Sequence, residues 1–349
     1  MSIEDKLIRR QVFIQRFSAS EARKLQETIT RLYQSIQSRL LREPSASLEV
    51  RLINVRRDLD IIMQQGFNEM SEDLKQLAFD FSADESDFSL RAMQLETRVP
   101  LSVPGISQLQ ASLLDSALDI PIGPNTLSLL DALNEFTTGR ANEIRLAIGD
   151  GVLLGETTPQ ISKRVAELAS GRHKAQAESL VRTIVNHTAS MARKSVTVNN
   201  SELFEADEWV AVLDSNTTLI CGGRDGRLYP IGRGPYPPAH WQCRSVRVPV
   251  LKPEFDTIKD KAKRPQKGDK KGKVDRNTKF DGWLRGQPAD FQDEYFSQFP
   301  DGLEKAALFR RGKLPIQAFR DETGRDFTLE QLRALEPIAF GLANIPPPT

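Results

Sequence analysis

Two cysteines and one histidine in the middle of the chain have side chains and a spacing that suit metal binding. Eighteen residues separate Cys221 from His240, and two residues separate His240 from Cys243. Thiolate and imidazole are the ligands that zinc prefers, usually four of them in a tetrahedron. A closed set of four makes the zinc structural, whereas three ligands and a water describe a catalytic ion. The spacing therefore indicates a candidate zinc site.

The sequence offers a fourth ligand less clearly. Asp225 is the nearest candidate, and Asp214 and His187 are the next. Asp225 followed by Gly226 also suits a hairpin turn, because glycine readily adopts a positive φ. Two alternatives to zinc stay open: a buried thiol pair beside a hydrogen-bonded histidine, and a disulfide between the two cysteines formed after release from the cell. No carboxylate is clearly placed as a base for a catalytic zinc.

Other catalytic patterns are missing from the sequence. It contains no phosphate-binding P-loop, no Gly-x-Ser-x-Gly elbow and no His-Glu-x-x-His motif. Of the other two histidines, His173 is expected to be exposed at a helix start. His187 is expected to be a core histidine with its hydrogen bonds satisfied. The sequence thus gives no positive case for an enzyme.

The elements that must position the cysteines and the histidine are short strands and tight turns. Alternating apolar residues predict strands at 208–214, 228–231 and 245–250. Glycine and proline are frequent in the two connecting stretches, 221–226 and 232–238. We therefore expect a small antiparallel sheet whose loops carry the cluster.

Helices are expected on both sides of this sheet. The spacing of Ser18 and Glu21 suggests a capping box that opens an amphipathic helix, which Pro44 would end. A second apolar run follows at 52–77, and helical patterns return at 127–136, 141–148 and after Thr158. A last helical stretch runs from 280 to about 335, with Thr328 and Gln331 spaced as another capping box.

This pattern predicts an α+β fold that is predominantly α. It divides into an N-terminal helical bundle or arm, a core with the small β module and the Cys/His cluster, a basic flexible linker, and a C-terminal helical module with a Pro-rich tail. We place their boundaries at 1–130, 131–251, 252–279 and 280–349.

Positive charge is concentrated in the predicted linker. The whole chain of 349 residues has a formal charge of +1, but 252–279 holds eleven Lys or Arg and five Asp or Glu, a net +6. Such a run is most often a solvated loop, and it can also contact phosphates. The residues expected to contact nucleic acid are Lys259, Lys261, Lys263, Arg264, Lys267, Lys270, Lys271 and Lys273.

Composition limits the environment of the protein. No stretch approaches the ~18–20 apolar residues of a membrane span, and the first residues lack the pattern of a signal peptide. Two cysteines cannot form a disulfide scaffold, so a reducing compartment is expected.

The residues around the cluster resemble the phage Mu F-like minor head protein family, the head-morphogenesis proteins of tailed phages and prophages. The resemblance lies in the stretches 209–229 and 234–245, in the helical stretch 181–193, and in 283–332, so that it spans roughly 140–335. Many members have a second cysteine three residues after the first, where this chain has Arg224. That departure leaves the zinc set of those members one ligand short.

The resemblance implies a virion protein that does not turn over a substrate. It would be made in the host cytoplasm and lie inside the head near the portal vertex. Its partners would be the portal protein, the major capsid protein and packaged double-stranded DNA, bound without sequence specificity, and it would support DNA packaging, retention or ejection. The alternative is a toxin-like or nucleic-acid-processing enzyme that uses the Cys/His cluster.

Overall fold

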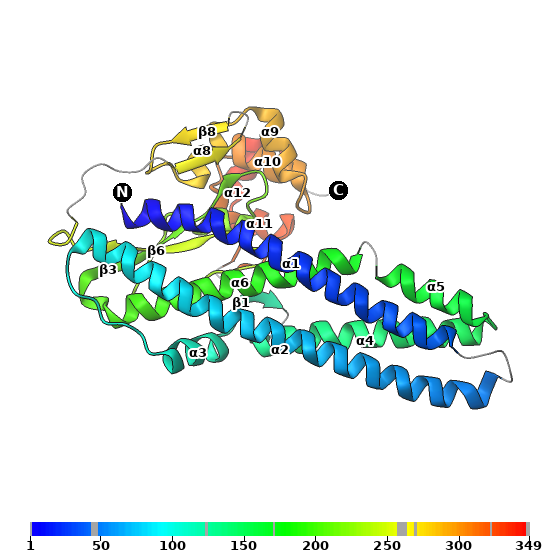
Figure 1. Ribbon diagram of the computed structural model, residues 1–349. Coiled ribbons are helices and arrows are strands. Elements are labelled where there is room, and N and C mark those ends of the chain that lie inside the picture. The colour runs from blue at the N-terminus through cyan, green and yellow to red at the C-terminus, as the bar shows by residue number, and fades with distance from the viewer. Residues whose placement is uncertain are drawn as a thin grey trace.

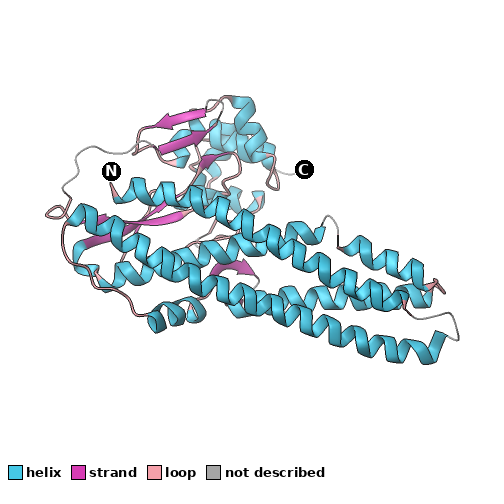
Figure 2. Ribbon diagram, viewed as in Figure 1, coloured by secondary structure: helices cyan, strands magenta, loops and turns pink. Residues whose placement is uncertain are grey.

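In the computed structural model, long helices form an elongated bundle, and the larger sheets lie at one end of it (Figures 1 and 2). The bundle contains α1 (Ile3–Leu41), α2 (Leu48–Thr97), α4 (Leu129–Leu153), α5 (Thr158–Leu168) and α6 (Arg172–Asn199). The structure describes residues 2–42, 48–122, 125–169, 172–256, 264–268, 271–321 and 323–346. The predominantly helical α+β class is therefore confirmed.

Helix α1 begins earlier than the sequence pattern predicts. Its N-cap is Ser2, whose hydroxyl accepts a hydrogen bond from the backbone N–H of Asp5. Ser18 lies inside the helix, and its hydroxyl donates to the carbonyl of Gln15, so the predicted capping box at Ser18 is wrong. The apolar stripe continues N-terminally through Leu7 and Ile14, both fully buried, and this extra burial stabilises the longer helix. Pro44 lies outside the described residues.

One hydrophobic core joins the N-terminal helices to the helices that follow residue 130. It runs from Ile14 in α1 to Ala189 in α6 and includes side chains of α2, α4 and α5. The predicted division at 130 falls beside Leu127 and Leu129, which both belong to this core. The short helix α3 (Ile106–Asp115) and the hairpin of β1 (Leu118–Ile122) and β2 (Asn125–Leu127) close one side of it.

The predicted antiparallel sheet is present. Its strand order is β5-β3-β6, with β3 (Phe204–Val210) in the centre, β5 (Leu228–Tyr229) on one side and β6 (Val246–Leu251) on the other. Trp209 of β3 is opposite Arg247 of β6 and is fully buried.

A second three-stranded sheet uses part of the segment predicted to be a linker. The short strand β4 (Leu213–Asp214) pairs in parallel with β7 (Arg264–Lys267), and β7 pairs in antiparallel fashion with β8 (Lys271–Val274). These residues are part of the folded structure because Arg264 is buried in an ion pair, as described below. The basic composition of the segment alone did not indicate strands.

The C-terminal module is helical, as predicted, and has its own aromatic core. Its elements are α8 (Phe280–Arg285), α9 (Ala289–Phe296), α10 (Gly302–Arg310), the 3-10 helix η2 (Ile316–Phe319), α11 (Leu329–Leu335) and α12 (Pro337–Ala343). The predicted capping box of Thr328 and Gln331 opens α11. Leu213 and Leu219 of the middle region pack into the same core, so the module is fixed to the β region.

None of the described helices is both long enough and apolar enough to span a membrane.

A buried carboxylate fixes the packing of the three longest helices. Glu85 of α2 is fully buried between two arginines, Arg10 of α1 and Arg193 of α6. Each arginine Nε donates to one Glu85 carboxylate oxygen over 2.7 Å. A charge in the interior needs a partner of opposite sign. Both arginines reach Glu85 only when the three helices are aligned along one another in one way.

We expect Glu85→Gln to lower the free energy of unfolding by about 3–5 kcal/mol, because it leaves two guanidinium groups without a buried negative charge. Urea unfolding monitored by circular dichroism measures this change. The matched control is Asp87→Asn on the same helix, which breaks the exposed pair with Arg91 and should cost below about 1 kcal/mol. Equal losses for the two variants would contradict the role assigned to Glu85.

Candidate metal centre

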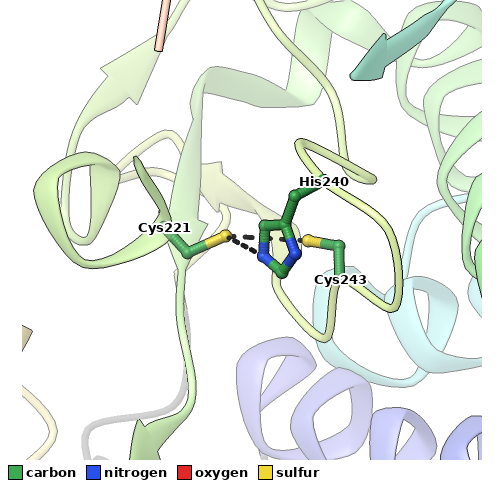
Figure 3. A group of neighbouring side chains, drawn as sticks. All are labelled: Cys221, His240 and Cys243. Atoms are coloured by element: carbon green, nitrogen blue, oxygen red, sulfur yellow. Dashed lines mark hydrogen bonds between the residues drawn. The ribbon is translucent and has the colours of Figure 1, made fainter. Parts of the chain in front are cut away.

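The structure brings Cys221, His240 and Cys243 together (Figure 3). Their ligand atoms all lie within 4.8 Å of one another. The Cys221 Sγ is 3.2 Å from His240 Nε2 and 3.7 Å from the Cys243 Sγ. Cys221 comes from the short helix α7 (Leu219–Arg224), and the other two residues come from the turn before β6. Two sulfurs on one tetrahedral zinc, with bonds of about 2.3 Å, would lie about 3.8 Å apart.

A backbone hydrogen bond fixes the orientation of the His240 ring. Its Nδ1 is 2.8 Å from the carbonyl oxygen of Trp241, which can only accept, so Nδ1 carries the proton. In the neutral ring, Nε2 then has a free lone pair, and Nε2 is the atom that faces the sulfur of Cys221. Metal-binding histidines are commonly held this way by a backbone carbonyl. The donor set therefore fits a metal ion.

Burial and mutual contact separate the acidities of the two thiols. Burial, the hydrogen bond to Cys243 and the charge of Cys243 raise the pKa of Cys221. Burial also acts to raise the pKa of Cys243, but the hydrogen bond from Cys221 and the nearby His240 outweigh it and lower this pKa well below its usual value. Burial acts to lower the pKa of His240, and the charge of Cys243 outweighs it, so the His240 pKa is raised. These shifts make Cys243 the more acidic of the two thiols.

Hydroxyl groups and apolar side chains complete the surroundings of the sulfurs. The hydroxyl groups of Thr218 and Ser245 act to lower the pKa of Cys221 and partly offset its rise. Trp209 and Ala239 pack with both cysteines in one buried apolar cluster. Water is therefore largely excluded from the two cysteines, because Cys221 is 2% exposed and Cys243 is 1% exposed.

Helix α6 holds the turn that carries His240 and Cys243. The Thr183 hydroxyl accepts the backbone N–H of Gln242 over 3.0 Å, and the Asn186 amide donates to the Cys243 carbonyl over 3.0 Å. Asn186 in turn accepts a hydrogen bond from Gln11 of α1. Sequence reasoning missed these supports because they lie more than fifty residues away. The polar Thr183 and Asn186, which flank the apolar Ile184 and Val185, were the available signal.

The C-terminal module holds the other side of the cluster, helix α7. A side-chain carbon on Gly222 would lie 2.6 Å from the Phe280 ring. One on Gly223 would lie 2.9 Å from the backbone of Gln317 in η2. Glycine is required at both positions because α7 packs so closely on these residues, which places Cys221 by contact.

Asp225, the predicted fourth ligand, has other partners in the structure. One carboxylate oxygen accepts the backbone N–H of Ala211 and the other accepts that of Phe280, each over 2.7 Å. Both oxygens also accept from the buried guanidinium of Arg264, at 3.0 Å. The three-residue cluster does not include Asp225.

The other residues considered as ligands are also placed elsewhere. Asp214 receives two hydrogen bonds from Arg244. His187 is a core histidine, as predicted: its Nε2 donates to the Leu113 carbonyl, and burial lowers its pKa to about 4. The prediction for His173 is wrong, because this side chain is buried between Tyr33 and Glu143.

Arg224 stands three residues after Cys221, at the position where the family resemblance implies a further cysteine. It lies one turn after Cys221 on α7, so the two residues share a face of the helix. Its guanidinium carbon is 5.1 Å from the centre of the Trp209 ring, and the residue is 8% exposed. A large buried cation thus stands where a third thiolate would be.

The basic residues expected to contact nucleic acid divide into two groups. The side chain of Arg264 is only 4% exposed and forms an ion pair with Asp225, so its charge does not face the solvent. Lys267 and Lys273 on the β7–β8 hairpin are exposed, and Lys271 lies in β8. The others lie outside the described residues: Lys259, Lys261, Lys263 and Lys270.

Comparison with known proteins supports the resemblance seen in the sequence. No curated protein and no solved structure matches the chain. A family model described as Phage Mu protein F like protein matches residues 142–248. This range begins within α4, contains Cys221, His240 and Cys243, and ends within β6, so the resemblance beyond 248 stays a prediction. Residues 142–248, which contain the whole Cys/His cluster and the supporting helix α6, are thus similar to the Phage Mu protein F like family.

Proposed function

We propose that this protein is a structural head-morphogenesis protein of a tailed phage or prophage, which associates with the portal and the inner capsid. The observation that carries the proposal is the family match, because it covers the Cys/His cluster and α6 together. The packing of the cluster supports a bracing role rather than turnover. Both sulfurs are buried, and no described carboxylate belongs to the group of ligand atoms to act as a base.

The metal that suits the cluster is zinc in a structural role. Cys221, His240 and Cys243 would hold the ion, which would cross-link α7 to the turn before β6. Support comes from the 3.7 Å sulfur separation and from the Trp241 carbonyl that orients His240. An ion bound by these residues would fasten the C-terminal module, through α7, to the helical bundle.

We expect about one zinc per chain in protein purified without chelator, because two thiolates, one imidazole and one more ligand complete a single tetrahedron. Cys221→Ser, Cys243→Ser and His240→Ala should each lose the metal in elemental analysis, whereas His187→Gln should keep it. Binding should weaken as the pH falls, because protons compete for the ligand atoms. Wild-type protein that stays metal-free when zinc is supplied would contradict the site.

The same measurement tests the fourth ligand. Asp225→Asn should keep the zinc content and lose stability, because the carboxylate of Asp225 is already used by Arg264 and two backbone N–H groups. Circular dichroism shows whether the variant is folded before its metal is counted. Loss of zinc from folded Asp225→Asn protein would assign Asp225 to the metal instead.

We place DNA contact on the β7–β8 hairpin and the neighbouring basic residues. Lys267 and Lys273 are exposed on adjacent strands, which leaves their charges available to phosphates. Arg264 is left out of this surface because it is buried. Phosphate contacts of this kind bind without sequence preference and weaken with salt.

Replacing Lys267 and Lys273 together by Gln should weaken binding to duplex DNA. The slope of log K against log salt should become shallower by about 2, because each phosphate contact contributes about 0.9. Fluorescence anisotropy over a salt series measures both. The matched control is the double change Lys163→Gln and Lys174→Gln, two exposed lysines on α5 and α6, which should leave the slope unchanged. Equal slopes for all three proteins would remove the hairpin from the DNA surface.

The association with other head proteins is tested by co-expression with the portal and major capsid proteins of the same phage. We expect the chain to co-purify with the portal and to be present in filled particles at low copy number. Particles that lack this chain should fill or infect poorly. Particles that mature, fill and infect normally without it would contradict the proposed function.

A further inference from the structure

We propose that Cys221 and Cys243 form a reversible disulfide in the metal-free protein, so that the cluster is an oxidant-sensitive site whose covalent state moves α7 relative to α6. The inference concerns the site to which the proposed function assigns zinc. The formation of the bond does not depend on the metal, and only its protection by zinc rests on that function.

The two thiols are placed to react with each other. They are the only cysteines in the chain, and their sulfurs are already in contact at 3.7 Å. They come from different elements, α7 and the turn before β6, so the bond would cross-link two separate parts of the fold. The sulfurs must approach by about 1.7 Å to reach a disulfide bond length of about 2.0 Å.

The turn that carries Cys243 lies beside the surface of the protein. The two residues between His240 and Cys243 lie at the surface, with Trp241 38% exposed and Gln242 exposed. The thiolate is the form that reacts with peroxides and disulfides. Because its turn is exposed, Cys243 is the sulfur that meets the oxidant first.

Hydrogen peroxide provides a balanced route. The Cys243 thiolate attacks one peroxide oxygen, the O–O bond breaks, and the sulfur becomes a sulfenic acid while the other oxygen leaves as hydroxide and takes a proton to form water. The Cys221 sulfur, after giving up its proton, then attacks the sulfenic sulfur. The S–S bond forms, and the hydroxyl leaves with a proton as a second water. Two thiols lose two electrons and two protons, and the peroxide takes them up.

Closing the bond would displace α7 more than the turn. Hydrogen bonds from Thr183 and Asn186 hold the turn on α6, at Gln242 and Cys243. Helix α7 is a short helix that packs on Phe280 and Gln317 of the C-terminal module. A movement of Cys221 toward Cys243 is therefore passed to α8 and η2, and oxidation would change how the C-terminal module sits on the bundle.

The test uses the full-length protein, stripped of metal with a chelator and treated with hydrogen peroxide. We expect the loss of both free thiols, a mass lower by two hydrogen atoms, and a cross-linked Cys221–Cys243 peptide that a dithiol reductant removes. Protein saturated with zinc at about 100 times its Kd should react about 100-fold more slowly, because only the metal-free fraction is oxidised. Amide hydrogen exchange should change in α7 and η2 after oxidation.

Single variants are the controls. Cys221→Ser should be oxidised at Cys243 without an internal cross-link, and Cys243→Ser should react more slowly than wild type. Metal-free wild type that keeps both thiols, or that forms only links between chains, would overturn the inference. Exchange changes confined to the turn would overturn the movement of α7. If protein that never binds zinc still forms the disulfide, the proposed zinc site is wrong and the disulfide inference is supported.

Discussion

The buried carboxylate of Asp225 joins three parts of the structure. It ends α7 and accepts hydrogen bonds from Ala211 before β4, from Arg264 of β7 and from Phe280 at the start of α8. A carboxylate in the interior costs several kcal/mol unless its oxygens are paired, so these four donors are satisfied in one arrangement. Arg264 extends the network to the carbonyls of Ala211 and Thr278. The position of α7, and with it that of Cys221, depends on this network.

The partner sulfur depends on a different support. Cys243 is placed by polar side chains of α6, and α6 is itself fixed to α1 and α2 through Arg193 and Glu85. The Cys/His cluster therefore lies where two separately stabilised parts of the protein meet, the helical bundle and the C-terminal module. A bond made or broken among its three side chains acts on that junction, while most of the hydrophobic burial on either side stays unchanged.

The sequence predicts what is decided locally. The strands of the β5-β3-β6 sheet, the capping box at Thr328 and the Cys/His cluster follow from residues that are close in the chain. The failures come from distant partners: Glu143 and Tyr33 bury His173, and burial of Leu7 and Ile14 extends α1 beyond Ser18. Arg264 is an arginine in a run of lysines, and arginine is the cation better suited to buried ion pairs. Its residue type was therefore a sequence signal for a buried ion pair. Without knowledge of Asp225 as its partner, the surrounding charge favoured a solvated linker.

The Cys/His cluster can avoid a buried net charge in three ways. Two sulfurs and an imidazole lie in an apolar shell, where a net charge is expensive. A proton shared between Cys243 and His240, a divalent ion between two thiolates and a neutral imidazole, and a disulfide each leave the group neutral. A third thiolate beside the ion would add a negative charge. This chain has Arg224 at that position, and the Trp209 ring stabilises its guanidinium by a cation–π contact. Two thiolates and a neutral imidazole would therefore already neutralise a divalent ion without a third cysteine.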